Sequence, residues 1–138
     1  MKQIKISEIA TSRLVKNEDL NHHKTLYAGR GVEWLVEAGF ITAAKLVDPK
    51  LLRCVHFSEM NFSAPIFIGD ILDFKSKVIK LGRSSITTYV KMLVNDKICG
   101  EGFLTFVKVV NEKSEPHNLE LILETEEDIL LNEKCKKL

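Results

Sequence analysis

The stretch "LNHHKTLYAGRGVEWLVEAGFITAAKL", from Leu20 to Leu46, begins with polar residues and continues into a long apolar segment. Apolar residues recur at helical spacing along one side, at Val32, Leu35, Val36, Gly39, Phe40, Ala43 and Leu46. The other side is apolar as well, at Trp34, Ala38, Ile41 and Ala44. A helix that is apolar nearly all round is expected to be buried nearly all round. The sequence therefore predicts one long central helix over about residues 27–47, ended by Pro49.

The pattern changes from helical spacing to alternation after Pro49. Over about residues 51–112 it predicts four long antiparallel strands, with hairpin connections at Gly82-Arg83 and Asn95-Asp96. A short strand is expected within residues 11–19, and a polar tail or short terminal helix over residues 114–138. A helix that is apolar on all sides needs a sheet that curls around it. The predicted fold class is therefore α+β, an antiparallel sheet wrapped around one central helix in a single domain of residues 1–138.

Composition and charge exclude several kinds of function. The 138 residues carry 20 Lys and Arg against 19 Asp and Glu, mixed along the chain, so no surface for nucleic acid is expected. The first residues lack the apolar run of a signal peptide, and no segment reaches the length of a membrane span. We therefore expect no membrane contact and a cytoplasmic location. Cys54, Cys99 and Cys135 lie far apart without a CxxC pair, which indicates reduced, structural thiols.

The adjacent histidines His22 and His23 raise the question of a metal site. Neighbouring side chains point in different directions, and no third ligand lies at a ligand-like spacing, so no metal is predicted. Either histidine can instead face the mouth of a site and bind a carbonyl group or water. Ordinary exposure on a loop explains them equally well.

Three stretches together resemble the hotdog-fold acyl-CoA thioesterases: "NHHKTLYAGRGVEWLVEAGFITAA" (21–44), "FSAPIFIGDIL" (62–72) and "LGRSSITTYVKM" (81–92). The resemblance implies an acyl-CoA thioester hydrolase that releases a free carboxylic acid and coenzyme A. It also implies a homodimer, or a tetramer or hexamer built from dimers, with the site at the dimer interface. No cofactor would be required, since coenzyme A enters as part of the substrate.

The resemblance assigns the catalytic residues to the first stretch. Asn21 would orient water or the carbonyl group, and the Gly29 N–H at the helix N-terminus would polarise that carbonyl. His23 would lie at the mouth of the site. Val36 occupies the position of the family's catalytic Asp or Glu, so Glu37, the next residue, or Glu33, one turn earlier, would have to supply the carboxylate. A solvated or interface glutamate is the alternative for each.

The resemblance assigns coenzyme A binding to the third stretch. Arg83, Ser84 and Ser85, which follow Gly82 at the predicted hairpin, would contact the phosphates and the pantetheine. A plain polar turn is the alternative. Arg30, at the start of the helix, would either bind phosphate or pair with an acidic neighbour.

Two other functions remain open at this level. The first is a non-catalytic hotdog protein that binds acyl-CoA or another acyl ligand and has lost the acid at position 36. The second is dehydration of a hydroxyacyl thioester, which requires an Asp-His or His-Glu pair that the sequence does not provide in a recognisable pattern.

Overall fold

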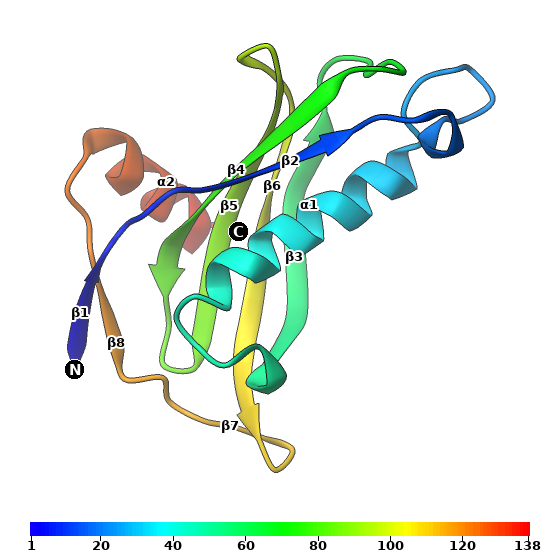
Figure 1. Cartoon of the computed structure of the whole chain (residues 1–138). Coiled ribbons are helices and arrows are strands. Elements are labelled where there is room, and N and C mark those ends of the chain that lie inside the picture. Colours follow the sequence, from blue (N-terminus) through cyan, green and yellow to red (C-terminus); the bar gives the residue numbers. More distant parts are fainter.

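The computed structural model describes all residues from Met1 to Leu138 and contains one principal sheet with a helix on each face (Figure 1). Its strands lie in the order β2-β4-β5-β6-β3, with every neighbouring pair antiparallel. They are β2 (Ile9–Leu14), β4 (Ile71–Leu81), β5 (Ser85–Val94), β6 (Lys97–Val110) and β3 (Leu52–Phe62), and the short β7 (Lys113–Ser114) pairs with β6. The predicted α+β class, with an antiparallel sheet curled around one helix, is confirmed.

The central helix α1 (Ala28–Ala43) lies across one face of this sheet. It is shorter than the predicted range of 27–47, because the chain leaves the helix in a turn before Asp48 and Pro49. The buried side of the helix consists of Gly31, Trp34, Leu35, Ala38, Gly39, Thr42 and Ala43. The expectation of burial nearly all round was wrong, since Glu33 and Glu37 are exposed. The sheet covers only one side of α1, and the opposite side faces outward.

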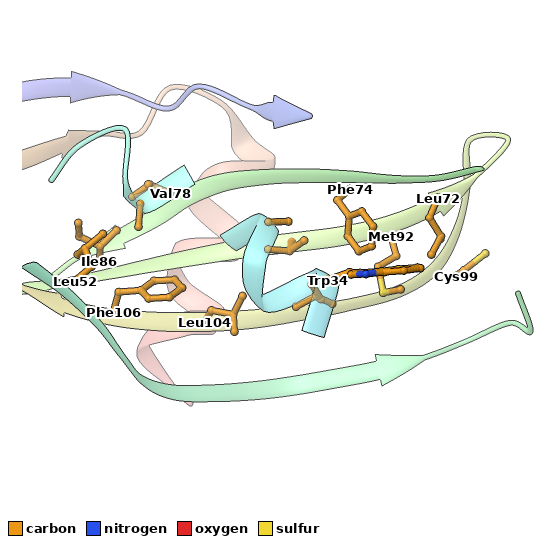
Figure 2. Packing of buried hydrophobic residues seen from close by; sticks show 14 of the residues in the cluster. Trp34, Leu52, Leu72, Phe74, Val78, Ile86, Met92, Cys99, Leu104 and Phe106 are labelled. Carbon is orange, nitrogen blue, oxygen red and sulfur yellow. The ribbon is translucent and has the colours of Figure 1, made fainter. Parts of the chain in front are cut away.

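The core between α1 and the sheet follows from alternation along the strands (Figure 2). The inward positions are Leu72, Phe74 and Val78 on β4, Ile86, Val90 and Met92 on β5, and Leu104 and Phe106 on β6. Gly39 lets the helix approach the sheet closely, because a Cβ at this position would lie 2.8 Å from Thr88 Oγ1. The β5–β6 hairpin turns at Asn95 and Asp96, which adopt positive φ angles of 49° and 65° as a tight two-residue turn requires.

The second helix, α2 (Glu126–Lys136), covers the opposite face of the sheet. Its Cys135 packs with Ile79, Tyr89 and Phe103, which point away from α1. Thr125 caps the helix, since its Oγ1 accepts a hydrogen bond from Asp128 N at 3.1 Å.

Polar contacts fix α2 in place on that face. Asp128 Oδ1 lies 2.6 Å from Lys77 Nζ, and Asn132 Nδ2 donates to the Ile79 carbonyl oxygen at 2.8 Å. The predicted terminal helix corresponds to α2. The same terminal segment also contains β8 (Leu119–Ile122), which pairs in parallel with β1 (Lys2–Lys5) at the start of the chain. The sequence did not predict this pair of strands.

Candidate active site

The N-terminus of α1 presents free backbone donors. Arg30 N and Gly31 N donate to the Tyr27 carbonyl oxygen at 3.0 and 3.1 Å, whereas the N–H groups of Ala28 and Gly29 have no acceptor in the protein. Tyr27 is the N-cap residue, and its side chain makes no capping hydrogen bond. Unpaired N–H groups and the helix dipole together make this end of the helix attractive to negative charge.

A pocket of about 390 Å³ opens beside this helix end. One wall is the loop before α1 with its first residue, and the other is the segment that follows β3. The lining residues are Asn21, Thr25, Leu26, Ala28, Phe62, Ser63, Ala64, Pro65 and Ile66. The fold therefore brings the first two of the three sequence stretches together around one cavity with a mixed apolar and polar lining.

Asn21 holds the loop before the helix in shape. Its Oδ1 accepts hydrogen bonds from His23 N at 2.8 Å and Thr25 N at 3.2 Å, and its Nδ2 donates to Thr25 Oγ1 at 3.1 Å. A longer contact joins Nδ2 to the Leu26 carbonyl oxygen at 3.5 Å. Both ends of the amide are thus engaged within the loop that lines the pocket.

The histidines of this loop are exposed to solvent. The rings of His22 and His23 lie against each other, with centroids 3.9 Å apart and an interplanar angle of 43°. No group of three or more His, Cys, Asp or Glu side chains is arranged to hold a metal ion. His23 is anchored next to the pocket only through its backbone N–H, which donates to Asn21.

Arg30 is directed to a buried carboxylate. Its Nε lies 3.5 Å from Oδ1 of Asp19, whose side chain is 4% exposed, and Lys16 N donates to the other oxygen of that carboxylate at 2.9 Å. Of the two interpretations of Arg30, pairing with an acidic neighbour is therefore the one that the geometry favours. The burial of Asp19 could not be predicted from the sequence, because an aspartate in a polar loop shows no pattern that indicates burial.

The helix positions assigned to the catalytic acid differ in their surroundings. Val36 is half-buried and packs against the core, so no carboxylate occupies the position. Glu37 pairs with Arg13 of β2, whose guanidinium lies 5.4 Å from the ring centroid of Trp34. Glu33 is exposed and makes no ion pair or side-chain hydrogen bond. No carboxylate of this chain lines the pocket itself.

The hairpin residues assigned to coenzyme A lie at the other end of the protomer (Figure 1). Gly82, Arg83 and Ser84 connect β4 to β5, and Ser85 begins β5. The first residues of β3 lie at this same end of the sheet. Val107 on β6 pairs with Ser85 on one side and with Arg53, near the start of β3, on the other. The pocket at the α1 N-terminus lies beyond Phe62, at the last residues of β3.

A second pocket, of about 610 Å³, lies against this hairpin. Its walls are the hairpin itself, the segment around β8 and the C-terminal part of α2. Three cationic side chains line it, those of Lys80, Arg83 and Lys136, with Glu120 as the one carboxylate. His117, which also lines it, is a residue that sequence reasoning missed, because its partners on the hairpin are more than 30 residues away.

Comparison with known proteins places this geometry in a family. Residues 23–99 match the sequence model of the thioesterase superfamily. A protein of Bacillus subtilis (strain 168), named "Uncharacterized acyl-CoA thioester hydrolase YkhA", is 27% identical over 134 residues, which cover 93% of this chain and 77% of that protein. No helix of this chain is both long and apolar enough to cross a membrane.

Solved structures of thioesterases share the whole architecture. The crystal structure of an apo-hexameric acyl-CoA thioesterase aligns with a TM-score of 0.89 at 25% identity, over 99% of this chain and 92% of that chain. Staphylococcus aureus acyl-CoA hydrolase, solved with butyryl coenzyme A, coenzyme A and coenzyme A disulfide, aligns with a TM-score of 0.86 at 24% identity, over 99% and 85% of the two chains. The sheet curled around α1 is the hotdog fold of these enzymes, and this chain belongs to the thioesterase superfamily.

Proposed function

We propose that this protein hydrolyses acyl-CoA thioesters to a free carboxylic acid and coenzyme A. The observation that carries the proposal is the N-terminus of α1, where two unpaired N–H groups adjoin a pocket with a mixed apolar and polar lining. The carbonyl oxygen of a bound thioester would accept hydrogen bonds from Ala28 N and Gly29 N. These hydrogen bonds become stronger as negative charge develops on that oxygen, and this lowers the barrier to attack by water.

We place the carboxylate that activates this water on α1. In the Staphylococcus aureus hydrolase, an Asn and an Asp fifteen residues apart have each been replaced by Ala, and Asn21 and Val36 have the same separation here. Since valine cannot accept a proton, we propose Glu33 as the general base and keep Glu37 as the second candidate. Glu33 is free of ion pairs and one turn closer to the donors than Glu37, which Arg13 engages. Asn21 acts by holding the loop that shapes the pocket.

A homodimer would complete the site. β3 is an edge strand with the exposed apolar side chains Val55 and Phe57, and an open apolar edge favours pairing with a second copy. A two-fold axis that pairs β3 with its own copy antiparallel brings the last residues of one β3 beside the first residues of the other. The pocket of one protomer would then approach the β4–β5 hairpin of its partner, where Arg83, Ser84 and Ser85 offer donors to coenzyme A phosphates.

The proposal extends to larger assemblies of this dimer and to a reducing compartment. We propose that such dimers associate further, as in the hexameric thioesterase of the same fold, and that coenzyme A is the only non-protein group involved. All three cysteines are free, which suits a reducing compartment such as the cytoplasm.

The test of the proposed function is release of free thiol from a panel of acyl-CoAs of increasing chain length. Wild type should turn over at least one member of the panel, and Glu33→Gln should lower kcat about 100-fold, a typical contribution of a general base. Tight binding of every acyl-CoA without thiol release would refute hydrolysis.

A non-catalytic acyl-CoA-binding protein is the second candidate. It is favoured by one observation, that no carboxylate of the protomer lines the pocket. The valine at position 36, where the resemblance implies an acid, is in keeping with it. Calorimetric titration with a non-hydrolysable acyl-CoA thioether, run beside the thiol-release assay, separates the two, because both proteins would bind the thioether but only the hydrolase would release thiol from the acyl-CoAs.

A further inference from the structure

The tip of the β4–β5 hairpin is tied to the rest of the chain through its carbonyl groups. The Arg83 oxygen accepts a hydrogen bond from His117 N at 3.2 Å, and the Ser84 oxygen accepts one from Lys108 N at 2.9 Å. The Ser85 oxygen lies 3.0 Å from His117 Nε2. One residue of the C-terminal segment, His117, therefore provides two of these three hydrogen bonds.

The bonding of the His117 ring fixes its protonation pattern. Leu119 N donates to His117 Nδ1 at 3.0 Å, so Nδ1 must present a lone pair. The remaining ring proton is then on Nε2, which donates it to the Ser85 carbonyl oxygen. The ring bridges the start of β8 to the start of β5, two segments that share no other side-chain hydrogen bond.

This bridge bears on which backbone N–H groups of the hairpin are free to bind a ligand. With their carbonyl groups engaged, Arg83 and Ser84 keep N–H groups that have no acceptor in the protein. The cationic pocket lined by Lys80, Arg83 and Lys136 adjoins this part of the hairpin at Gly82 and Arg83. Successive free backbone N–H groups next to guanidinium and ammonium groups suit a phosphate, but only while the hairpin keeps this conformation.

We propose that His117 is a positioning residue for the coenzyme A phosphates: its imidazole holds the β4–β5 hairpin in the conformation that presents the Arg83 and Ser84 N–H groups and the Arg83 side chain. This inference rests on the proposed function, in which the hairpin contacts coenzyme A. His117 itself touches neither the thioester nor the α1 donors, so its loss should act on substrate affinity and leave the chemical step intact.

Two substitutions separate the hydrogen bond made by Nε2 of His117 from the one made by Nδ1. In His117→Gln the side-chain amide reaches as far as Nε2 and can still donate to Ser85, whereas in His117→Asn the shorter amide oxygen can only replace Nδ1 as acceptor for Leu119 N. Each variant loses one hydrogen bond, so a merely structural role predicts equal melting temperatures and equal kinetics. The proposal predicts a KM for acyl-CoA about three- to tenfold higher in His117→Asn, with KM within about twofold of wild type in His117→Gln and kcat unchanged in both.

Amide hydrogen exchange of residues 82–85, followed by mass spectrometry, decides the positioning role independently of turnover. Gly82 N donates to Ser85 O at 3.0 Å, and this amide should exchange about three- to tenfold faster in His117→Asn than in His117→Gln. If wild type neither binds nor hydrolyses any acyl-CoA, the proposed function fails while this exchange still supports or refutes the bridge. Equal exchange in the two variants, or equal KM values in an active enzyme, overturns the proposal.

Discussion

Arg13 on β2 pairs with Glu37 on α1, and its guanidinium also lies over the ring of Trp34. The two charged side chains are 41% and 54% exposed, so solvent screens the pair and its net stabilisation is at most about 1 kcal/mol. The consequence is chemical. The guanidinium occupies the Glu37 carboxylate, which leaves Glu33 as the carboxylate of the outward face that makes no ion pair.

The two glutamates should therefore differ in mutagenesis. Glu33→Gln is expected to lower kcat about 100-fold, and Glu37→Gln to change it less than about threefold, because only the former removes a free base near the α1 donors. Steady-state thiol release from the best acyl-CoA substrate measures both, with Arg13→Gln as a control for loss of the ion pair. The reverse order of effects would assign catalysis to Glu37.

Restoring an acid at position 36 should raise activity. Val36→Asp is expected to increase kcat at least about tenfold, because the carboxylate would occupy the position at which the resemblance to thioesterases implies an acid. The substitution should also lower the free energy of unfolding by about 1–3 kcal/mol, since Val36 packs against the core. Val36→Asn is the matched control, with a similar shape and polarity but no base. Equal activity of the Asp and Asn variants would show that position 36 does not face the reacting carbonyl.

Asn21 should behave as a loop-holding residue. Asn21→Ala removes both acceptor contacts to His23 N and Thr25 N and is expected to lower the free energy of unfolding by about 1–3 kcal/mol. Asn21→Asp keeps these acceptor contacts and should lose about half as much. Urea denaturation measures the difference. An Asn21→Ala variant with wild-type stability but no activity would instead indicate direct contact with the substrate.

Two glycines of α1 make opposite predictions for stability. Gly39→Ala is expected to lower the free energy of unfolding by about 1–3 kcal/mol, because the new methyl group would press on Leu104 and Thr88 in the core. Gly29→Ala meets only the ring of Tyr27, which is exposed and free to move, so its unfolding free energy should change by less than about 0.5 kcal/mol. Its kcat/KM should nevertheless fall, because the methyl group narrows access to the unpaired N–H groups. Retained activity in Gly29→Ala would argue against carbonyl binding there.

Alkaline pH should loosen α2 from the sheet. Burial raises the pKa of the Cys135 thiol to about 11, although Lys80 and Lys134 act in the opposite direction. Burial and the hydrogen bond to Glu101 raise the pKa of Tyr89. For Lys77, burial disfavours the charge, but Asp128 and Glu127 outweigh it, and the pKa is raised. All three groups bind protons more tightly in the native state, so the stability that they contribute is present below their unfolded pKa values and is lost as pH rises.

The measurement is urea denaturation of wild type and Cys135→Ala at pH 8 and pH 11. Between these values wild type should lose about 2 kcal/mol more than the variant, because the variant lacks the thiol whose pKa is shifted. The reactivity of thiols gives a second readout, since Cys135 should resist alkylation at pH 8 until the protein is unfolded. Parallel losses in the two proteins would exclude Cys135 as the source.

Much of the fold follows from local periodicity in the sequence. The 3.6-residue repeat over α1 and the two-residue alternation after Pro49 identify a central helix and a curled antiparallel sheet, because burial of one face selects those periods directly. The hairpins at Gly82-Arg83 and Asn95-Asp96 were also readable, since tight turns restrict the residue types that can occupy them. The short strands β1 and β8 were not, because four residues are too few to show a period.

For the candidate site, the sequence by itself determined which residues stand at the helix start and on the hairpin, and that position 36 is a valine where the resemblance to thioesterases implies an acid. Only the tertiary structure decided their relationships: the ion pair of Glu37 with Arg13, the burial of Asp19 against Arg30, and the ring of His117 beneath Ser85. Contacts between segments far apart in the chain depend on how strands are ordered and helices are seated. Local patterns of hydrophobicity do not determine the order of the strands or the position of each helix on the sheet. Side-chain packing between distant segments determines both.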